Sequence, residues 1–511
     1  MRKRWRTGQT RYILAFCLTS LLIYHAPLFS YAFHHIDHHS PDGWITLALL
    51  AAIVFITGFI LLALIGLVSA RLLKAFVVFS LLASAVALYF VNTYGVILDK
   101  GMMGNVFNTR STEAFSFLSP KLALYVVVWG LAPAWLFARL RIERGHRLRL
   151  ARNLLISVVL ALALVLANGG KSLWFDNHSK HLGGVIMPWS FLINSARIGM
   201  DKLSANRKQT LLPDGAFADD RKMVVVLIIG ESARADHFSL YGYGRKTNPL
   251  LEQENMTVLP NSRSCATYTT AAVHCILSAS GSSSDTTEPL PSYLHRLGAD
   301  VIWRTHNWGQ PPLQVDDFHN AGDLSQSCSG ENCQFDEVLL TGLDKRIASS
   351  TKNKIFVVLH MSGSHGPRYY QKYPARFEKF SPVCKSVELH ECTRQSLINA
   401  YDNSILYTDY FIKRVIDLLG KQPSPALMLY LSDHGESLGE HGLYLHGAPN
   451  AIAPREQRNI PFLVWQSANF PWPYAPQRKN HSQSEVFHTI LGAFGVNSSA
   501  YDQSLDLFSR P

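Results

Sequence analysis

The sequence lacks the paired cysteines of a zinc-thiolate site. Seven cysteines occur in 511 residues, and no two of them have a CxxC spacing. Such pairs are typical of zinc-thiolate sites, so we expect any metal in this chain to have oxygen and nitrogen ligands. Internal repeats and low-complexity segments are also absent, which excludes a repeat protein.

The C-terminal two thirds of the chain carry no excess of either charge. The formal net charge is +11, but residues 1–170 hold 16 Lys and Arg against 5 Asp and Glu, and the remainder holds 32 of each sign. A neutral soluble part does not attract a polyanion, so we expect no nucleic-acid partner.

Charged residues are scarce in five apolar runs at 12–33, 44–69, 75–98, 122–138 and 153–168. Each run is close to the ~17–25 residues of a membrane-spanning helix. The first run lacks a small-residue cleavage site, which argues against a removable signal peptide. We therefore predict a transmembrane domain of five helices at 1–170.

The basic residues near these runs predict the orientation in the membrane. They occupy alternate connections, and the positive-inside rule places them in the cytoplasm. The C-terminal domain is then expected outside the cytoplasm. The residues are Arg2, Lys3, Arg4, Arg6, Arg71, Lys74, Arg139, Arg141, Arg144, Arg147, Arg149 and Arg152.

Six cysteines follow residue 170, and Cys17 lies in the first span. An even number of cysteines outside the cytoplasm indicates disulfides. Several connectivities are open, and the pairing of sequence neighbours is the simplest. These neighbours are Cys265 with Cys275, Cys328 with Cys333, and Cys384 with Cys392.

Two segments of different composition follow the predicted spans. Residues 171–220 mix aromatic and basic residues, as do helices on a membrane surface, although a polar linker is the alternative. From 221 to 511, apolar runs alternate with helical stretches, which predicts an α/β domain with a doubly wound sheet. The expected strands are 224–229, 300–303, 355–359, 427–431 and 462–465.

Two of these strands end in metal-type ligands. Asp433 and His434 follow the run at 427–431, and Glu231 follows the run at 224–229. Open α/β sheets bind ligands beyond the carboxyl ends of their strands, so we expect the three side chains to meet in an active site.

A threonine-rich loop precedes a small-residue segment that can form a helix. Thr267, Thr269 and Thr270 are candidate nucleophiles, because a helix N-terminus favours an alkoxide and the phosphate it attacks. Threonine also caps helices, so the residues alone do not choose among the three.

Long motifs in this order resemble a known family. They are IGESARADHFSLYGYGRKTNP, two cysteines bracketing a threonine, LHMSGSHGP, QSLINAYDNSILYTD and SDHGESLGEHGLYLHGAPNAIAPREQ. The sequence resembles the phosphoethanolamine transferases of Gram-negative inner membranes, including the lipid A modifying colistin-resistance enzymes. These belong to the alkaline phosphatase superfamily.

The resemblance implies a fold, a reaction and a location. It implies an alkaline phosphatase-like central sheet, a catalytic domain in the periplasm and a multi-pass inner-membrane anchor. The donor would be phosphatidylethanolamine, and the acceptor a lipopolysaccharide phosphate or sugar, or another envelope glycan. We expect a monomer.

The resemblance also assigns roles to residues. Thr269, four residues after Cys265, would be the nucleophile. Zn²⁺ would be the metal, with Mn²⁺ as the alternative, and its ligands would be Glu231, Thr269, Asp433 and His434. The substrate-binding residues would be His365, His446, Asn105, Thr109 and Glu113.

The roles of other side chains remain open. His360 falls inside a strand-like run and is either a buried structural residue or a functional one. A loop is formed by His34, His35, His38 and His39, which either gather metal, contact acidic head groups or are simply solvated. The chain departs from the family at Ala266, Ala272 to His274, His441 and Ala448, and it has no basic residue soon after Asn307. These departures leave the acceptor undetermined.

Two alternatives share part of the chemistry. A sulfatase needs a C/S-x-P-x-R nucleophile motif, which the chain lacks. A phosphoglycerol transferase uses similar ligands, and a non-catalytic membrane scaffold would not need a complete nucleophile and ligand set. The cysteines and motifs favour phosphoethanolamine transfer.

Overall fold

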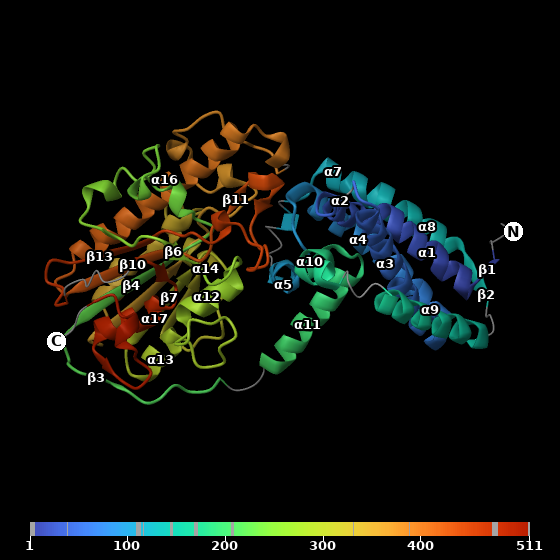
Figure 1. The fold of residues 1–511 in the computed structure, drawn as a ribbon. Helices are drawn as coiled ribbons and strands as arrows, with labels where there is room; N and C mark the ends of the chain where they lie inside the picture. The colour runs from blue at the N-terminus through green and yellow to red at the C-terminus, as the bar shows by residue number, and fades with distance from the viewer. Residues whose placement is uncertain are drawn as a thin grey trace. The chain divides into compact units, whose positions relative to one another are not determined.

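The chain forms two compact units in the computed structural model (Figure 1). One unit comprises Met1–Met103 with Ser111–Asp201, and the other Gly104–Arg110 with Lys202–Pro511. The structure describes residues 6–37, 39–108, 114–115, 117–143, 147–167, 172–205, 209–330, 332–387, 389–472 and 479–508.

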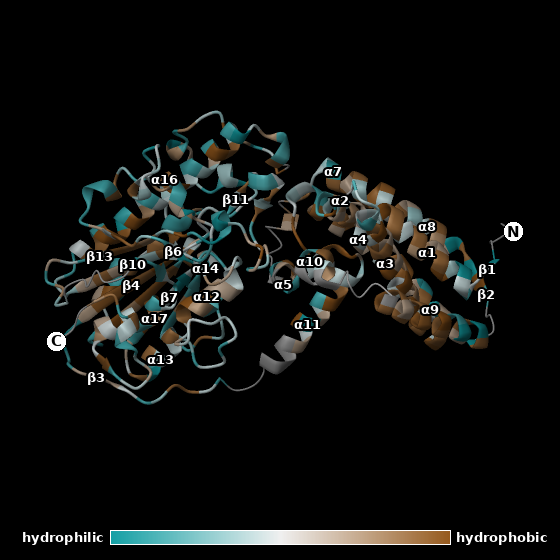
Figure 2. Ribbon diagram, in the orientation of Figure 1, coloured by the Kyte–Doolittle hydropathy of each residue, from teal (hydrophilic) through white to brown (hydrophobic). Residues whose placement is uncertain are grey.

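The first unit is built from long apolar helices, which are brown in Figure 2. Among the described residues, four helices are long and apolar enough to cross a membrane, and a fifth span results if α1 and α2, which meet at 58°, count as one. This agrees with the five predicted spans. The helices are α1 (Gln9–Tyr24), α2 (Ala26–His34), α3 (Pro41–Val68), α4 (Ala70–Tyr94), α5 (Lys100–Asn108), α7 (Pro120–Tyr125), the π-helix η1 (Val126–Leu131), α8 (Ala132–Arg139) and α9 (Arg147–Ala167), and α7, η1 and α8 form one continuous span.

Large apolar side chains point outward from these helices. Leu22 is 71% exposed, Val68 70% and Leu166 72%. Such a surface is unfavourable in water but suits the hydrocarbon of a bilayer, where helices satisfy their own backbone hydrogen bonds. The chain is therefore a membrane protein.

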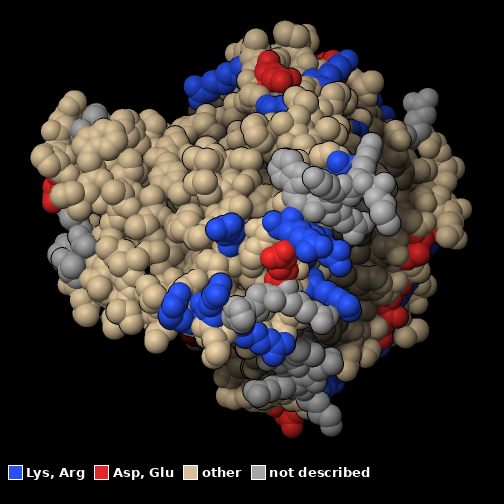
Figure 3. Space-filling model, turned by 90° about the vertical axis from the view of Figure 1, so that its right-hand side faces the viewer, with Lys and Arg blue, Asp and Glu red and all other residues tan. Residues whose placement is uncertain are grey.

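Basic residues gather at one end of the helical unit (Figure 3). There β1 (Arg6–Gly8) pairs in parallel with β2 (Arg141–Glu143), and Lys74 Nζ donates to the carbonyl of Leu140 at 2.9 Å. Arg71, Arg139 and Arg149 are exposed. The basic connections that the sequence placed on one side of the membrane do converge in space.

Two helices follow the last span, α10 (Ser172–Val185) and α11 (Trp189–Ala205). They lie in the segment for which short helices were predicted.

A seven-stranded sheet forms the centre of the second unit. Its order is β5-β13-β10-β4-β9-β7-β8. The five strands from β10 to β8 are parallel, whereas β13 runs antiparallel to both β10 and β5. The sheet is mixed, and the five predicted strands are confirmed. The bounds are β4 (Met223–Gly230), β5 (Thr257–Val258), β7 (Asp300–Thr305), β8 (Asp317–Asn320), β9 (Lys354–His360), β10 (Ala426–Ser432) and β13 (Phe462–Gln466).

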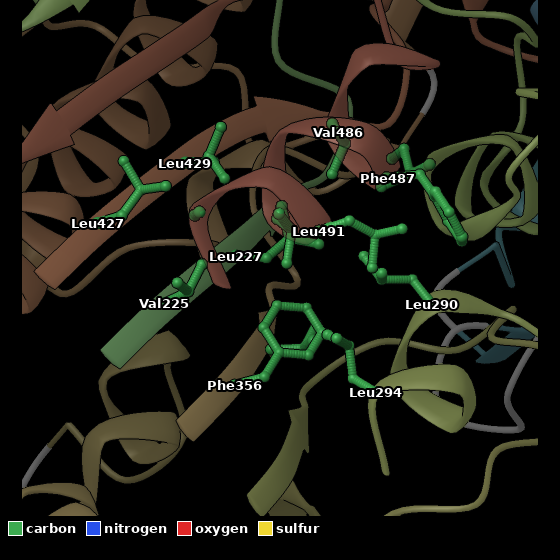
Figure 4. Packing of buried hydrophobic residues seen from close by; sticks show 14 of the residues in the cluster. Val225, Leu227, Leu290, Leu294, Phe356, Leu427, Leu429, Val486, Phe487 and Leu491 are labelled. Atoms are coloured by element: carbon green, nitrogen blue, oxygen red, sulfur yellow. The ribbon is translucent and has the colours of Figure 1, made fainter. Parts of the chain in front are cut away.

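Helices cover one face of this sheet (Figure 4). Leu227 of β4 and Phe356 of β9 point toward Leu294 of α13 and Leu491 of α17, and all four side chains are fully buried. Burying one such side chain stabilises the fold by about 1.5–3 kcal/mol. The helices on this face are α12 (Thr269–Leu277), α13 (Leu290–Arg296) and α17 (Glu485–Phe494).

The alternate residues of the strands are buried as well. Val226 and Met428 are at most 1% exposed, and α16 (Arg394–Gly420) contacts β10. Because both faces are covered, the strands are apolar throughout and their polar residues begin where they end. Smaller elements are β3 (Ala216–Phe217) with β15 (Val496–Asn497), β6 (Ser262–Arg263) with β14 (His481–Ser482), β11 (Ser437–Leu438) with β12 (Tyr444–Leu445), α14 (Ala321–Ser325) and α15 (Leu343–Ala348).

Candidate active site and metal centre

Neighbouring parallel strands deliver polar side chains to the same edge of the sheet. Ser432 at the end of β10 is in register with Gly230 at the end of β4, so the next residues, Asp433 and Glu231, emerge side by side. β7 ends two residues before Asn307. The predicted meeting point of the strand ends is present.

The acidic and histidine side chains converge there, and all are fully buried. His434 Nε2 lies 3.3 Å from Glu231 Oε1 and 3.2 Å from Asp433 Oδ2. Thr269 Oγ1 lies 3.0 Å from Glu231 Oε2 and 3.4 Å from His434 Nε2. The structure thus brings together the four residues predicted as ligands.

The ring of His434 is oriented by a backbone contact. Its Nδ1 lies 2.9 Å from the carbonyl oxygen of Gly435. A carbonyl can only accept, so Nδ1 carries the proton and Nε2 presents its lone pair to the cluster. Burial, followed by the neighbouring His446, lowers the pKa of His434 to about 4, which favours the neutral imidazole that binds metals.

Asp433 has one satisfied oxygen and one that faces the cluster. Oδ1 accepts from the backbone N–H groups of Ser232 (3.1 Å) and His434 (2.7 Å). Within the described residues, buried Oδ2 has no hydrogen-bond donor. Burial and the charge of Glu231 raise the pKa of Asp433 well above its ordinary value. Two buried carboxylates whose ligand oxygens lie within 4.8 Å of each other require a cation between them.

The donor set fits a divalent metal. Glu231, Asp433 and His434 each direct a ligand atom to within 4.8 Å of the others. A tetrahedral ion with bonds of about 2.0 Å separates its ligands by about 3.3 Å, close to the observed 3.2 and 3.3 Å. Carboxylate, imidazole and hydroxyl ligands agree with the absence of a thiolate motif.

Thr269 is the first residue of α12, and its loop is tightly held. Disulfide Cys265–Cys275 spans the loop from one side of Thr269 to the far part of the helix. The other two disulfides, Cys328–Cys333 and Cys384–Cys392, also join sequence neighbours. Among the described residues, Cys17 is the one free cysteine, and it is buried.

The other two threonines of the loop differ in position from Thr269. Thr267 Oγ1 donates to the carbonyl of Ala448 at 2.6 Å, and Gly447 N–H donates to the carbonyl of Thr267 at 2.9 Å. Thr267 therefore ties two loops together. Thr270 is half-buried. The hydroxyl of Thr269, by contrast, contacts the Glu231 carboxylate and the His434 imidazole.

Backbone strain is concentrated beside Glu231. Ser232 has φ 57°, a left-handed conformation that is unfavourable for a residue with a Cβ. Its hydroxyl donates to Glu231 Oε1 at 2.7 Å, and its carbonyl accepts from Tyr401 at 2.6 Å. These bonds hold the strained turn and aim the Glu231 carboxylate.

His446 and His365 lie on one side of the cluster. The ring of His446 is 4.2 Å from that of His434 and 5.1 Å from that of His365. His446 Nδ1 is 2.8 Å from Glu436 Oε2, and Tyr369 donates to Glu436 Oε1 at 2.6 Å. Burial raises the pKa of Glu436 to about 7.

Asn307 belongs to the site, although no role was predicted for it. Its Nδ2 donates to Glu231 Oε2 at 2.7 Å and to the carbonyl of Met361 at 2.9 Å. Its position four residues after the predicted strand 300–303 was the available signal, because that edge of the sheet already carried the ligands.

The remaining candidates lie on other elements or outside the described residues. Asn105 is buried in α5, whereas Thr109 and Glu113 lie outside the described residues. His360 ends β9 and is fully buried, as expected of a structural histidine. His34 and His35 each place Nδ1 on a backbone carbonyl four residues earlier, His39 is exposed, and His38 lies outside the described residues.

The fold and the site identify the class of the catalytic unit. The family model described as Sulfatase matches residues 223–496, which covers the sheet and every residue of the cluster. A second model, described as Phosphoethanolamine transferase EptA/EptB, matches residues 54–203.

Full-length relatives give the family itself. Phosphoethanolamine transferase EptA of Helicobacter pylori is 39% identical over 97% of this chain and 96% of its own length. Phosphatidylethanolamine transferase Mcr-1 of Escherichia coli is 35% identical over 77% of this chain and 78% of its own. The Kdo(2)-lipid A phosphoethanolamine 7''-transferase of Escherichia coli is 27% identical over 88% of this chain and 87% of its own.

A solved structure covers both units. The integral membrane lipooligosaccharide phosphoethanolamine transferase A of Neisseria meningitidis matches with a TM-score of 0.89 and 27% identity, over 99% of this chain and 100% of that one. The chain belongs to the phosphoethanolamine transferase family. It is an inner-membrane enzyme of that family, with a sulfatase-like catalytic fold.

Proposed function

We propose that the protein transfers phosphoethanolamine from phosphatidylethanolamine to a phosphate or sugar of lipopolysaccharide. The transfer proceeds through a covalent phosphoethanolamine-threonine intermediate on Thr269. The observation that carries this proposal is the position of the Thr269 hydroxyl, 3.0 Å from Glu231 and 3.4 Å from His434 at the start of a helix.

The proposed metal is Zn²⁺, held by Glu231, Thr269, Asp433 and His434. When bound, zinc stabilises the alkoxide form of a hydroxyl ligand and polarises a phosphoryl oxygen. The mixed oxygen and nitrogen donors and their spacing support this assignment.

The protein residues then divide the first half of the reaction among them. The Thr269 hydroxyl gives up its proton along its hydrogen bond to Glu231 Oε2, and Oγ1 forms a bond to the donor phosphorus. The bond from phosphorus to the glycerol oxygen breaks. His365 or His446 protonates that oxygen, and diacylglycerol leaves.

The second half reverses the roles. The same histidine removes the proton from the acceptor hydroxyl or phosphate, whose oxygen attacks the phosphorus held on Thr269. The Thr269–phosphorus bond breaks, and Oγ1 takes its proton back from Glu231 Oε2. A covalent carrier allows one site to serve two bulky lipids in turn.

The proposed location follows from the charges and cysteines. The basic end of the helical unit faces the cytoplasm, and the catalytic unit lies in the periplasm, where its three disulfides persist. We propose that the protein acts as a monomer, and that Asn105, Thr109 and Glu113 contribute to binding the donor lipid.

The test compares Thr269→Ala with Thr269→Ser in the full chain in detergent. With labelled phosphatidylethanolamine, wild type and Thr269→Ser should gain the mass of one phosphoethanolamine group, and Thr269→Ala should gain none. Loss of the nucleophile is expected to lower transfer by at least about 10³-fold. Full transfer by Thr269→Ala would refute the intermediate.

Mass spectrometry of lipid A and core from cells with and without the gene identifies the acceptor, and no adduct on either would refute lipopolysaccharide as acceptor.

A further inference from the structure

Gln483 joins the loop that carries Thr269 to the strand end that carries two of the ligands. It lies between β14 and α17, and its side chain is 1% exposed. Nε2 donates to the carbonyl of Asp433 at 2.6 Å and to that of Ser432 at 3.2 Å, and Oε1 accepts from the N–H of Cys265 at 3.0 Å. One buried amide thus connects two segments that are far apart in the sequence.

Both partners of Gln483 are backbone groups next to functional side chains. Cys265 precedes Thr269 by four residues, and its disulfide ties it to Cys275 of the helix that Thr269 begins. The carbonyl of Asp433 belongs to the peptide group that joins Asp433 to His434, and the N–H of this peptide group donates to Asp433 Oδ1 at 2.7 Å. A shift of that peptide group therefore moves both ligands.

The backbone pairing near Gln483 stops short of the ligands. β14 and β6 pair over two residues each, and their last pair is Ser482 with Arg263. Beyond this pair, the side-chain amide of Gln483 continues the connection from the segment after β6 to the end of β10. The amide thereby restrains the distance between these two segments.

The distance matters because the Thr269 hydroxyl is placed by a few short contacts. Oγ1 lies 3.0 Å from Glu231 Oε2 and 3.4 Å from His434 Nε2. A displacement of about 1 Å, caused by a residue away from the reacting atoms, can lower a rate by about 10²-fold. Residues that orient metal ligands from outside have comparable effects on metal affinity.

We propose that Gln483 is a positioning residue that holds the loop of Thr269 at a fixed distance from the ligands Asp433 and His434. The inference rests on the proposed function, in which Thr269 attacks the donor phosphorus. Gln483 acts through the backbone of Cys265 and Asp433. Its loss should therefore affect the chemical step and the metal affinity, and not the binding of the donor lipid.

The test uses the full chain in detergent with Gln483→Met, which keeps the length of the side chain and removes the amide. We expect Gln483→Met to lower kcat about thirtyfold while KM for phosphatidylethanolamine changes less than about twofold. The dissociation constant for Zn²⁺, measured without lipid, should rise at least about tenfold. Gln483→Asn keeps the amide but is one carbon shorter, so it cannot reach both partners and should show the same pattern with a smaller loss of stability.

Asn403→Leu is the matched control for the loss of a buried amide. Asn403 is fully buried on α16, its Oδ1 accepts from the N–H groups of Lys379 and Phe380, and its Nδ2 donates to the carbonyl of Phe380. The control should lower Tm about as much as Gln483→Met, with kcat and Zn²⁺ affinity unchanged.

The outcomes separate positioning from a general structural role. Unchanged kcat and Zn²⁺ affinity in Gln483→Met and Gln483→Asn overturn the inference. So does a change confined to KM, or an equal loss of kcat and Zn²⁺ affinity in Asn403→Leu. Failure of wild type to acquire phosphoethanolamine on Thr269 would instead reject the proposed function, and the Zn²⁺ affinities would still report whether Gln483 positions the ligands.

Discussion

At the scale of single residues, Gly363 has no room for a side chain. Its φ is 49°, and a Cβ there would lie 2.7 Å from the carbonyl oxygen and 2.9 Å from the nitrogen of Glu231. We expect Gly363→Ala to displace Glu231, to lose most of the bound metal and to lower transfer at least about tenfold. The added strain and contact should destabilise the fold by about 2–4 kcal/mol. Metal analysis, activity and thermal unfolding of the full chain measure these effects.

Gly342 offers a matched control, because its φ is 62° and a Cβ there meets nothing within 4 Å. Gly342→Ala should cost only the strain of a side chain in the left-handed conformation, about 1–2 kcal/mol, with metal and transfer unchanged. Equal losses of metal, transfer and stability in the two variants would show that crowding at Glu231 is unimportant.

The site residues that directly follow strands were predictable from the sequence, but the residues that support them were not. Glu231, Asp433 and His434 were predictable because their side chains come directly after buried apolar runs, and parallel strands end at one edge. The role of Ser232 depends on a positive φ, and that of Glu436 on contacts with His446 and Tyr369. Such features arise only from three-dimensional packing.

At the scale of elements, Asp285 holds the loop that leaves α12. Its carboxylate accepts from Ser278 Oγ (2.8 Å), Ser280 Oγ (2.7 Å) and the Thr287 N–H (2.9 Å). Burial raises the pKa of Asp285, but these hydrogen bonds outweigh it and lower the pKa from 3.8 to about 2. The charged form is thus stabilised by folding. Its contribution is fully present above about pH 4 and is lost as the pH falls through 2.

We therefore expect Asp285→Asn to destabilise the protein at pH 7 by about 1–2 kcal/mol, after allowance for partial exposure. Thermal unfolding should show the difference from wild type shrinking as the pH falls from 4 toward 2. The exposed Asp344→Asn on α15 is the control and should show no such trend. A difference that stays constant with pH would contradict the assigned hydrogen bonds.

The types of the main elements were predictable, and their pairing was not. Five strands were recognised from apolar runs, but β13 is antiparallel to β10 because it starts at the edge of the sheet where β10 ends, with Phe462 opposite Leu431. The two-residue β5 is too short to give a pattern. The break between α1 and α2 has a local cause, since Pro27 lies in the first turn of α2 and cannot continue the hydrogen bonds of α1.

At the scale of the whole molecule, we predict that the basic end of the helical unit faces the cytoplasm and that the catalytic unit is in the periplasm. The basic end of the helical unit carries Arg141 on β2, whereas the catalytic unit carries Arg455, and both side chains are exposed. Basic connections remain in the cytoplasm because their transfer across the bilayer is unfavourable. The native cysteines should react little with a thiol reagent, because six of them form disulfides and Cys17 is buried.

Arg141→Cys and Arg455→Cys test this arrangement with a membrane-impermeant maleimide. In cells with a permeabilised outer membrane, Arg455→Cys should be labelled and Arg141→Cys should not. After the inner membrane is disrupted, both should react, which shows that Arg141→Cys is accessible once the reagent reaches it. Loss of one basic residue leaves Arg139, Arg147 and Arg149 in the same connection, so the orientation should survive the substitution. Labelling of Arg141→Cys in intact spheroplasts would place the basic end in the periplasm, and the lipid-modifying site would then be on the wrong side for lipopolysaccharide.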